Sequence, residues 1–485
     1  MFEPMRKLCG RRRGGLRKAL DRKRKDLSRY GMKEMSAMLG QWIDPDLFRA
    51  ESSGSFSRRR LFDFATTFQA FLWQVLQGQA SCREAVRQVQ ISRIASHDKV
   101  PDTSTGAYCR ARSRLPMKRL GKINLAVLEK ISRLTREEDR WMGREVKVLD
   151  GTAVSMDDTP KNAAEYAYGT GQAPGCGLPL VHMVGMFSLS NGAWLGYNSA
   201  GSKRHDLVLS AELVQKQVEV GDVVLADRGF CAYWMLALLK NQGADAVMRL
   251  HQSRSKDLRQ GKSLGKEQRL VTWTKPKRPD QCPLSEEEYA KLPDQLTVRI
   301  LRTRSEVKGY PTREMLLVTT LCESDAIPAE SLSELYRRRW QIELNFDDLK
   351  TTLGMDHLAC KSPRLVERAM AIYVCAYNLI RAAMIEAAAC AQAPLDRLSF
   401  KGSANALLKG LSGVPGSAKS IQRTRQLWEL VIELIAQDLL PLRPGRREPR
   451  AIKRRPKKFP LLTKHRATYP EIPHRNRYKA NKPLK

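Results

Sequence analysis

Between residues 145 and 250 the apolar residues change from a helical to an alternating spacing, and this change most constrains the fold. Short runs rich in β-branched residues predict strands at 146–149, 182–189, 194–197, 222–226 and 246–250. Segments with helical spacing at 206–218 and 233–241 predict helices between them. Strands that alternate with helices in this way are typical of an α/β domain.

The flanking regions have other patterns. Residues 55–135 have helical spacing, and Ser81 with Glu84 forms a capping box for one of the helices. Residues 252–310 are polar, with strand-like pieces at 270–273 and 296–303, and predict a β-rich insertion before the α/β domain resumes at 314–321. Further helices are expected at 363–391, 402–411 and 417–440.

The chain is strongly basic. It has 85 Lys and Arg against 51 Asp and Glu, a net charge of +34, so a polyanion is the expected partner and an acidic protein surface the alternative. The first 30 residues hold twelve basic residues against three acids, in runs such as 11–13 and 22–25. Residues 441–485 hold sixteen against two, with repeated Pro. We expect a basic arm and a basic tail that contact phosphates.

Several classes of protein are excluded by pattern. No uncharged apolar run approaches the roughly 20 residues that a bilayer requires, since the best candidate, 369–380, stops at Arg381. The ten cysteines are widely spaced, which predicts free thiols and no structural zinc. No apolar signal core follows the first arginines, so a cytoplasmic, nucleoid-associated protein is expected. The phosphate-binding loop of ATPases is also missing, so no ATP is expected.

A short helix expected between Thr103 and Pro116 displays Arg110 and Arg114 one turn apart. This arrangement is similar to a helix–turn–helix module that binds DNA. An ordinary basic helical bundle is the alternative, because surface arginines on one helix pair are common.

Two aspartates, Asp150 and Asp227, directly follow predicted strands. Each could simply belong to a turn, because Asp-Gly and Asp-Arg-Gly are turn sequences. A third element strengthens the case for function. Ser331 and Glu334 form a second capping box, and no Gly or Pro occurs before Gly354, which predicts one helix of about 22 residues.

On that helix four polar side chains fall on a stripe about 60° wide: Tyr336, Arg339, Glu343 and Lys350. An apolar stripe beside it would dock the helix and direct Glu343 along the sheet edge. A solvated charged face is the alternative. Converging Asp, Asp and Glu side chains suit Mg²⁺, or Mn²⁺ in its place. Two such ions can support in-line displacement at a phosphodiester.

The spacing Tyr336-x2-Arg339-x3-Glu343-x6-Lys350 resembles the signature of bacterial DDE transposases of the insertion sequence four family. Three further blocks are similar to that family and stand in its order: 149–152, 158–162 and 226–230. The similarity covers about 145–360, with a similar basic end at 453–460. Asp157 departs from the family pattern, which has Pro there.

The resemblance implies a ribonuclease-H-like core with a β-rich insertion, and a triad of Asp150, Asp227 and Glu343 that holds the metal ions. Tyr336, Arg339 and Lys350 would then position the DNA end. Trp340 and Trp273 are candidates for stacking on a flipped base, although either could be a core residue. The implied domains are a basic arm with a helical DNA-binding domain at 1–140, a core at 141–251 and 311–400, the insertion at 252–310, C-terminal helices at 401–440 and the basic tail at 441–485.

The predicted function is cut-and-paste DNA transposition, with metal-dependent cleavage and strand transfer of element ends. The partners would be the terminal repeats and target DNA, and the family implies a homodimer in the end complex. The alternatives are a non-catalytic basic protein that binds nucleic acid, or an inactive domesticated relative. The three-acid constellation favours the enzyme, because a pure binder does not require it.

Overall fold

A computed structural model gives the fold. It describes residues 42–49, 54, 56–57, 60–95, 97–169, 175–201, 205–254, 258–265, 267–305, 313–412, 421–442, 462–465 and 468–469. The predicted basic arm at 1–30 and most of the basic tail, including 453–460, lie outside these residues.

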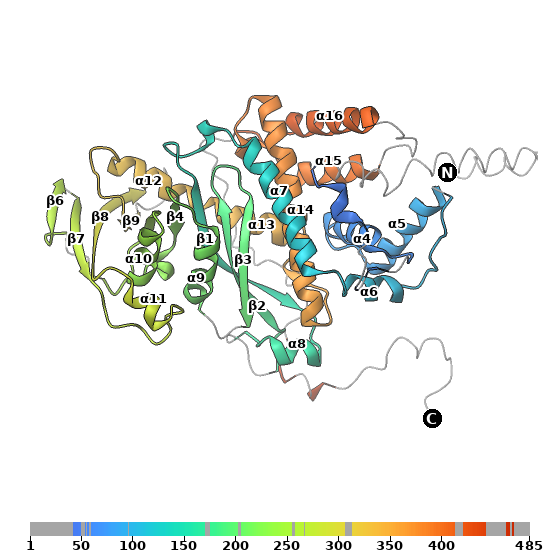
Figure 1. Cartoon of the computed structure of the whole chain (residues 1–485), viewed down its shortest axis with the longest axis horizontal. Helices are drawn as coiled ribbons and strands as arrows, with labels where there is room; N and C mark the ends of the chain where they lie inside the picture. The colour runs from blue at the N-terminus through green and yellow to red at the C-terminus, as the bar shows by residue number, and fades with distance from the viewer. Residues whose placement is uncertain are drawn as a thin grey trace, which may run out of the picture.

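One sheet of ten strands runs through the described part of the chain, in the order β3-β2-β1-β4-β5-β9-β8-β7-β6, with β10 beside β1 (Figure 1). The strands are β1 Val146–Met156, β2 Leu180–Ser188, β3 Trp194–Gly201, β4 Val223–Ala226, β5 Asp245–Arg249, β6 Lys262–Gly265, β7 Gln268–Thr274, β8 Gln295–Ser305, β9 Arg313–Thr319 and β10 His357–Leu358.

The first five strands have the ribonuclease-H topology. Strands β1, β2 and β3 form an antiparallel meander, and β4 and β5 lie parallel to β1. The insertion continues the same sheet, because β9 pairs antiparallel with β5 and then with β8. The predicted α/β class, with a ribonuclease-H-like core and a β-rich insertion, is therefore confirmed.

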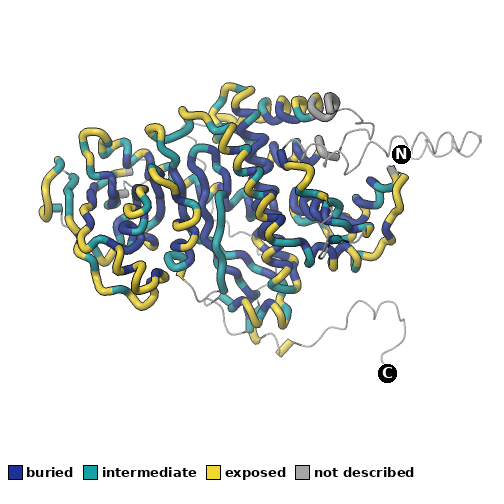
Figure 2. The backbone as a smooth tube through the Cα atoms, viewed as in Figure 1, coloured by how far each residue is buried: buried dark blue, intermediate teal, exposed yellow. Residues whose placement is uncertain are grey.

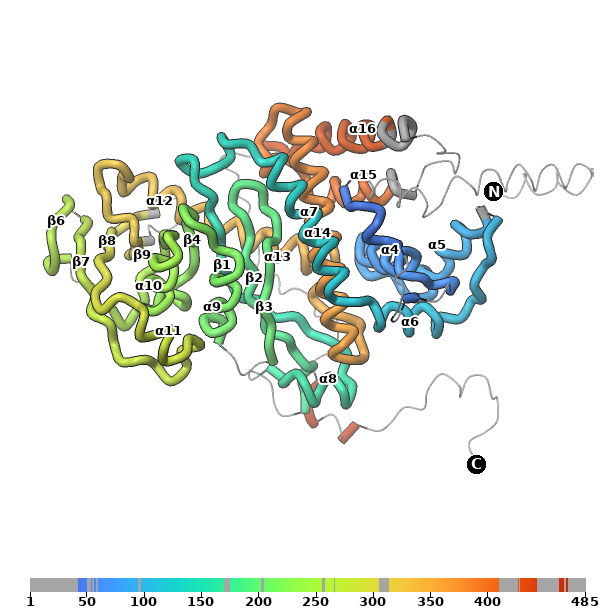
Figure 3. Tube along the Cα trace, viewed as in Figure 1, coloured from blue at the N-terminus to red at the C-terminus, as the bar shows by residue number. Residues whose placement is uncertain are grey.

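Helices cover both faces of the sheet, and Figure 3 traces their order along the chain. They are α4 Phe64–Leu76, α5 Cys82–Ala95, α6 Gly106–Arg112, α7 Met117–Leu134, α8 Pro160–Glu165, α9 Asp206–Gln217, α10 Tyr233–Asn241, α11 Glu286–Ala290, α12 Ala329–Arg338, α13 Gln341–Asp347, α14 Pro363–Ala391, α15 Phe400–Ser412 and α16 Ile421–Gln437. Alternation along β1 separates the two faces: Leu149 packs in a core with α9 and α10, whereas Val148 packs in a core with α12, α13 and α14.

Strand β1 is longer than the sequence predicted. It continues past Leu149 to Met156, so Asp150-Gly151 is not a turn, and Asp150 pairs with Gly185 of β2. The prediction failed because Asp-Gly favours turns locally, whereas pairing with β2 along nine residues holds this segment extended.

The predicted 22-residue helix is also wrong in detail. It begins at Ala329 after Pro328, so Ser331 lies inside α12 and the capping box expected there does not form. Around Arg339 and Trp340 the backbone N–H groups bond three residues back instead of four, which separates α12 from α13. A π-helical turn, Asp348–Thr352, then follows α13. By contrast, Ser81 and Glu84 form the predicted reciprocal box at the start of α5.

Helix α14 is the centre of the helical part of the molecule. Among the described helices it alone is long and apolar enough to cross a membrane by length and composition, and 78% of its apolar window is buried inside the protein. It packs against α4, α7, α15 and α16, where Figure 2 shows a mostly buried backbone. It is therefore a core helix, and Arg381, the residue at which the apolar run ends, is buried in the protein interior.

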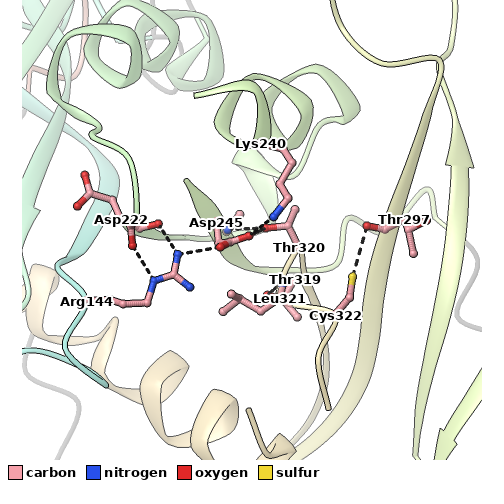
Figure 4. Close-up of polar contacts among 11 residues, drawn as sticks. Arg144, Asp222, Lys240, Asp245, Thr297, Thr319, Thr320, Leu321 and Cys322 are labelled. Atoms are coloured by element: carbon pink, nitrogen blue, oxygen red, sulfur yellow. Dashed lines mark hydrogen bonds and ion pairs between the residues drawn. The ribbon is translucent and has the colours of Figure 1, made fainter. Parts of the chain in front are cut away.

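A network of charges joins the amino-terminal ends of β4 and β5 (Figure 4). The Asp245 carboxylate accepts from Arg144 at 2.7 Å, from Lys240 at 2.9 Å and from the Thr320 hydroxyl at 2.7 Å. Burial alone raises the pKa of Asp245, but these hydrogen bonds outweigh it and hold the pKa below its usual range. This end of the sheet is closed by structural ion pairs, so the opposite, carboxyl end is left for chemistry.

Candidate active site

The register of the parallel strands brings Asp150 and Asp227 to one level. Val148 pairs with Leu225, and Leu225 pairs with Val247. Asp150, Asp227 and Arg249 each stand two residues beyond one of these. By alternation, their side chains share a face with Val148, Leu225 and Val247, which is the face that α12, α13 and α14 cover.

Arg339 connects this sheet edge to the helices. Its guanidinium lies 3.2 Å from the Asp150 carboxylate and 3.4 Å from that of Glu343, and its side chain is only 14% exposed. Two members of the predicted stripe, Arg339 and Glu343, therefore still meet across the helix break. The guanidinium also stands 5.9 Å from the centre of the Tyr336 ring.

The three predicted carboxylates influence one another. Burial raises the pKa of Asp150, and the charges of Glu343 and Asp227 add to this effect, against the Gly151 N–H and Arg339. Tyr336 is buried as well, which raises its pKa to about 12, although Arg339 and Arg249 oppose the rise. The site thus brings negative charge together beside two arginines, Arg339 and Arg249.

Helix α13 is seated by two contacts. The ring of Phe346 lies edge-on to Phe187, with centroids 5.2 Å apart, directly over Gly185. A Cβ at Gly185 would stand 3.2 Å from Phe346, so glycine allows this close approach, opposite Asp150 in the sheet. On the other side, buried Arg381 donates to Asn345 at 2.8 Å and pairs with Asp348 at 3.1 Å.

Three further predicted residues can now be placed. Trp340 is 61% exposed and Leu344, one turn later, is 57% exposed, so Trp340 is not a core residue. Trp273 is 7% exposed and lies under Arg254, with the guanidinium 4.1 Å from the ring centre, so it belongs to the core of the insertion. Lys350 lies half-buried in the π-helical turn after α13.

The block 158–162 is structural. The Thr159 hydroxyl accepts from the Asn162 N–H at the start of α8, and the buried Asn162 amide donates to the Cys360 carbonyl at 2.7 Å. This contact ties the end of β1 to the segment between α13 and α14. Asp157, the departure from the family pattern, lies 3.1 Å from His357 and not in the triad.

Arg110 and Arg114 lie apart from the triad residues. Both line a cavity of about 610 Å³ in the N-terminal helical unit, with Arg60, Arg93 and Lys99. The pKa of Arg114 is lowered by burial and by the charges of neighbouring arginines. The helix spacing did not predict the three additional basic residues, because none of them lies on α6: Arg93 is on α5, Lys99 in the segment between the two helices and Arg60 before α4.

The donor set fits a divalent cation chemically, since the three carboxylates are hard oxygen ligands that act on one another. In the described part of the chain, no three His, Cys, Asp or Glu side chains are close enough to form a metal site as they stand. The positive charge that lies between the carboxylates of Asp150 and Glu343 is the guanidinium of Arg339.

Comparison with known proteins agrees with this fold. Residues 141–379 match the family model described as the transposase DDE domain. The chain is 24% identical over 450 residues, 90% of its length, to the transposase InsG for insertion sequence element IS4 of Escherichia coli (strain K12), covering 97% of that protein. It is 47% identical over 53 residues to the putative transposase InsL for insertion sequence element IS186A of the same organism, covering 11% of this chain and 14% of that protein.

Among solved structures, a piggyBac transposase synaptic complex with hairpin DNA aligns over 85% of this chain and 84% of that one. Its identity is 11% and its TM-score 0.39, too low to support an argument. The near full-length relative and the family model, which spans the whole ribonuclease-H-like sheet, decide the identity. The chain is a DNA transposase that belongs to the DDE transposases of the insertion sequence four family.

Proposed function

We propose that Asp150, Asp227 and Glu343 are the catalytic residues and hold two Mg²⁺ ions, which Mn²⁺ can replace. The observation that carries the proposal is Arg339, whose guanidinium pairs with both Asp150, 189 residues away in sequence, and Glu343. When bound, divalent ions of this kind lower the pKa of an attacking water and stabilise the leaving oxygen of a phosphodiester. The reaction is cleavage of the element ends followed by transfer of the strand to target DNA.

The remaining residues of the stripe would position the DNA. Arg339 pairs with the carboxylates of Asp150 and Glu343, and its planar fork would suit a backbone phosphate where cations neutralise those two groups. Tyr336 limits how far that guanidinium can move, because it packs beside it. Lys350 provides a further positive charge on the same helical segment.

The surface around the site fits a DNA end. Trp340 and Leu344 form an exposed apolar pair next to Glu343, suited to stacking on an unpaired base. The cavity with Arg110 and Arg114 would bind DNA further from the cut. We infer a homodimer that holds both ends of the element, acting in the cytoplasm on the nucleoid.

The test compares Glu343→Gln with Glu334→Gln, an exposed glutamate on the neighbouring helix. Cleavage of a duplex carrying the terminal repeat that borders the chain's own gene is measured in Mg²⁺, and DNA binding in Ca²⁺. Glu343→Gln should cut at least about a hundredfold more slowly, since a metal contact is worth several kcal/mol. It should still bind DNA and lose affinity for Mn²⁺ measured by electron paramagnetic resonance.

Arg339→Ala completes the experiment with the opposite pattern. It should lose stable end complexes in a gel shift, because its role is to hold phosphate and not metal. Normal cleavage by Glu343→Gln would overturn the catalytic assignment and favour the alternative, a basic protein that only binds nucleic acid. Normal end complexes and normal cleavage by Arg339→Ala would remove the positioning role.

A further inference from the structure

Three arginines converge on a pocket of about 260 Å³ beside the predicted active site. They are Arg228, Arg249 and Arg302, and we call the space the arginine pocket. None of the three belongs to the signature helix. Each comes from a different element: the 3₁₀ turn Arg228–Phe230, strand β5 and strand β8.

The sheet brings the three together. Arg228 directly follows Asp227, and Arg249 stands at the level of Asp227 on the next strand. Arg302 pairs with Leu316 of β9, whose carbonyl accepts the Leu250 N–H at 2.9 Å. The pocket therefore extends from Arg228, the residue after Asp227, across β5 and β9 to the insertion.

The lining of the pocket offers these arginines no carboxylate partner of their own. Within the described residues, the guanidinium groups of Arg228, Arg249 and Arg302 make no hydrogen bond or ion pair with another side chain. The one carboxylate in the lining, Glu314, already pairs with Arg304 at 2.9 Å. By contrast, Arg339, which belongs to the candidate active site, forms ion pairs with two carboxylates.

Like charges without counter-charges destabilise one another unless an anion binds between them. Three planar donor groups around a space of this kind fit a phosphate, because guanidinium groups can bind its oxygens in pairs. Arg249 also connects it to the signature helix, since its charge acts on Tyr336.

We propose that the arginine pocket binds a backbone phosphate of the DNA strand that continues past the cleaved phosphodiester toward the insertion. The proposal rests on the proposed function, because it takes the scissile bond to lie at Asp227. It gives the insertion a role in the reaction: β8 supplies Arg302, so the insertion completes a DNA-binding surface that the ribonuclease-H core begins.

The experiment combines protein variants with neutralised DNA. Single methylphosphonate groups are placed along the strand near the cut in a terminal-repeat duplex, and binding is measured in Ca²⁺, so cleavage plays no part. With the unmodified protein, one methylphosphonate position should weaken binding about tenfold. With Arg302→Gln or Arg228→Gln, binding should start about tenfold weaker and the same methylphosphonate should add nothing.

Arg269→Gln is the matched control. Arg269 lies on β7 of the same insertion, and its guanidinium donates to Ser263, Gly265 and Gln268, all within the β6–β7 hairpin. The substitution removes the same charge without touching the pocket, so its binding and its response to methylphosphonate should match the unmodified protein.

Two results would show that the pocket does not hold a DNA phosphate. One is that Arg302→Gln and Arg228→Gln bind the duplex as tightly as Arg269→Gln. The other is that their loss of DNA affinity adds to the loss caused by a methylphosphonate at every position tested. Failure of the proposed function gives a different result. In that case Glu343→Gln cleaves normally, whatever the arginine variants do in the binding assay.

Discussion

Aspartates at the two ends of strand β4 have different surroundings. Asp222 precedes β4 and forms a buried ion pair with Lys147 at 2.6 Å, whereas Asp227 follows β4 and faces the candidate site. The apolar run alone does not distinguish them, because both aspartates border it. The difference lies in Lys and Arg side chains from other segments of the chain, which form ion pairs with the aspartates at the amino-terminal end of the sheet.

Asp245 tests the structural role at that end. We expect Asp245→Asn to lower the free energy of unfolding by about 3 kcal/mol at pH 7, because it leaves Arg144 and Lys240 without their shared carboxylate. A folded-state pKa below the usual value stabilises the fold above the unfolded pKa, near 3.9, and this stabilisation is lost as pH falls through the folded value.

Denaturant unfolding from pH 8 to pH 3.5 checks this. The difference between Asp245→Asn and the unmodified protein should stay constant down to about pH 5 and shrink only below about pH 4. The control is Asp294→Asn, whose side chain is 92% exposed and which should change stability by less than about 1 kcal/mol. Equal effects of the two substitutions would contradict a structural role for the buried network.

At the scale of elements, periodicity predicted what each segment becomes, but not how the segments are joined. The strands at 182–189 and 222–226 and the helix at 363–391 follow their patterns closely. Local signals failed where tertiary contacts compete: Asp150-Gly151 is extended by pairing with β2, and Arg339 lies at a tightened turn. Motif spacing predicted the triad residues, but it did not indicate Arg249 or Arg302, because only the sheet order makes these two neighbours.

The seat of α13 on the sheet gives a prediction at this scale. A methyl group at Gly185 would lie 3.0 Å from Phe187 and 3.2 Å from Phe346, so in Gly185→Ala these rings must give way and the contact that seats α13 opposite Asp150 is disturbed. We expect a loss of about 1–3 kcal/mol in unfolding free energy, and slower cleavage with DNA binding retained. Gly121→Ala is the control: no atom lies within 4 Å of the new methyl group, and alanine favours helix α7. If both variants are equally stable and active, Gly185 does not set the position of α13.

At the scale of the whole molecule, the net charge of +34 is distributed over surfaces that are far apart in the fold. One is the cavity with Arg110 and Arg114 in the helical unit, and another is the arginine pocket at the insertion. In Figure 1, α6 of the helical unit and β8 of the insertion lie to opposite sides of β1, the strand that carries Asp150. A DNA end bound at the central sheet can therefore be held from both sides, each contact releasing counterions.

The tail adds a third basic region, and part of it docks on the core. The Cys176 thiol donates to the Lys464 carbonyl at 3.1 Å, and His465 packs against Gly175. Deletion of 441–485 thus removes both charge and a packing interaction. Substituting Gln for the nine Lys and Arg residues at 443–458 removes charge alone.

Both variants should flatten the plot of log K for nonspecific duplex DNA against log salt, by about 0.9 for each phosphate that the tail no longer neutralises. The substituted chain should keep the melting temperature of the unmodified protein, whereas the deletion should lower it. If the deletion alone flattens the slope, the tail acts by packing near Cys176 and not by its charge. If neither does, the basic tail does not touch DNA phosphates, and the two arginine-lined cavities carry the electrostatic attraction to DNA.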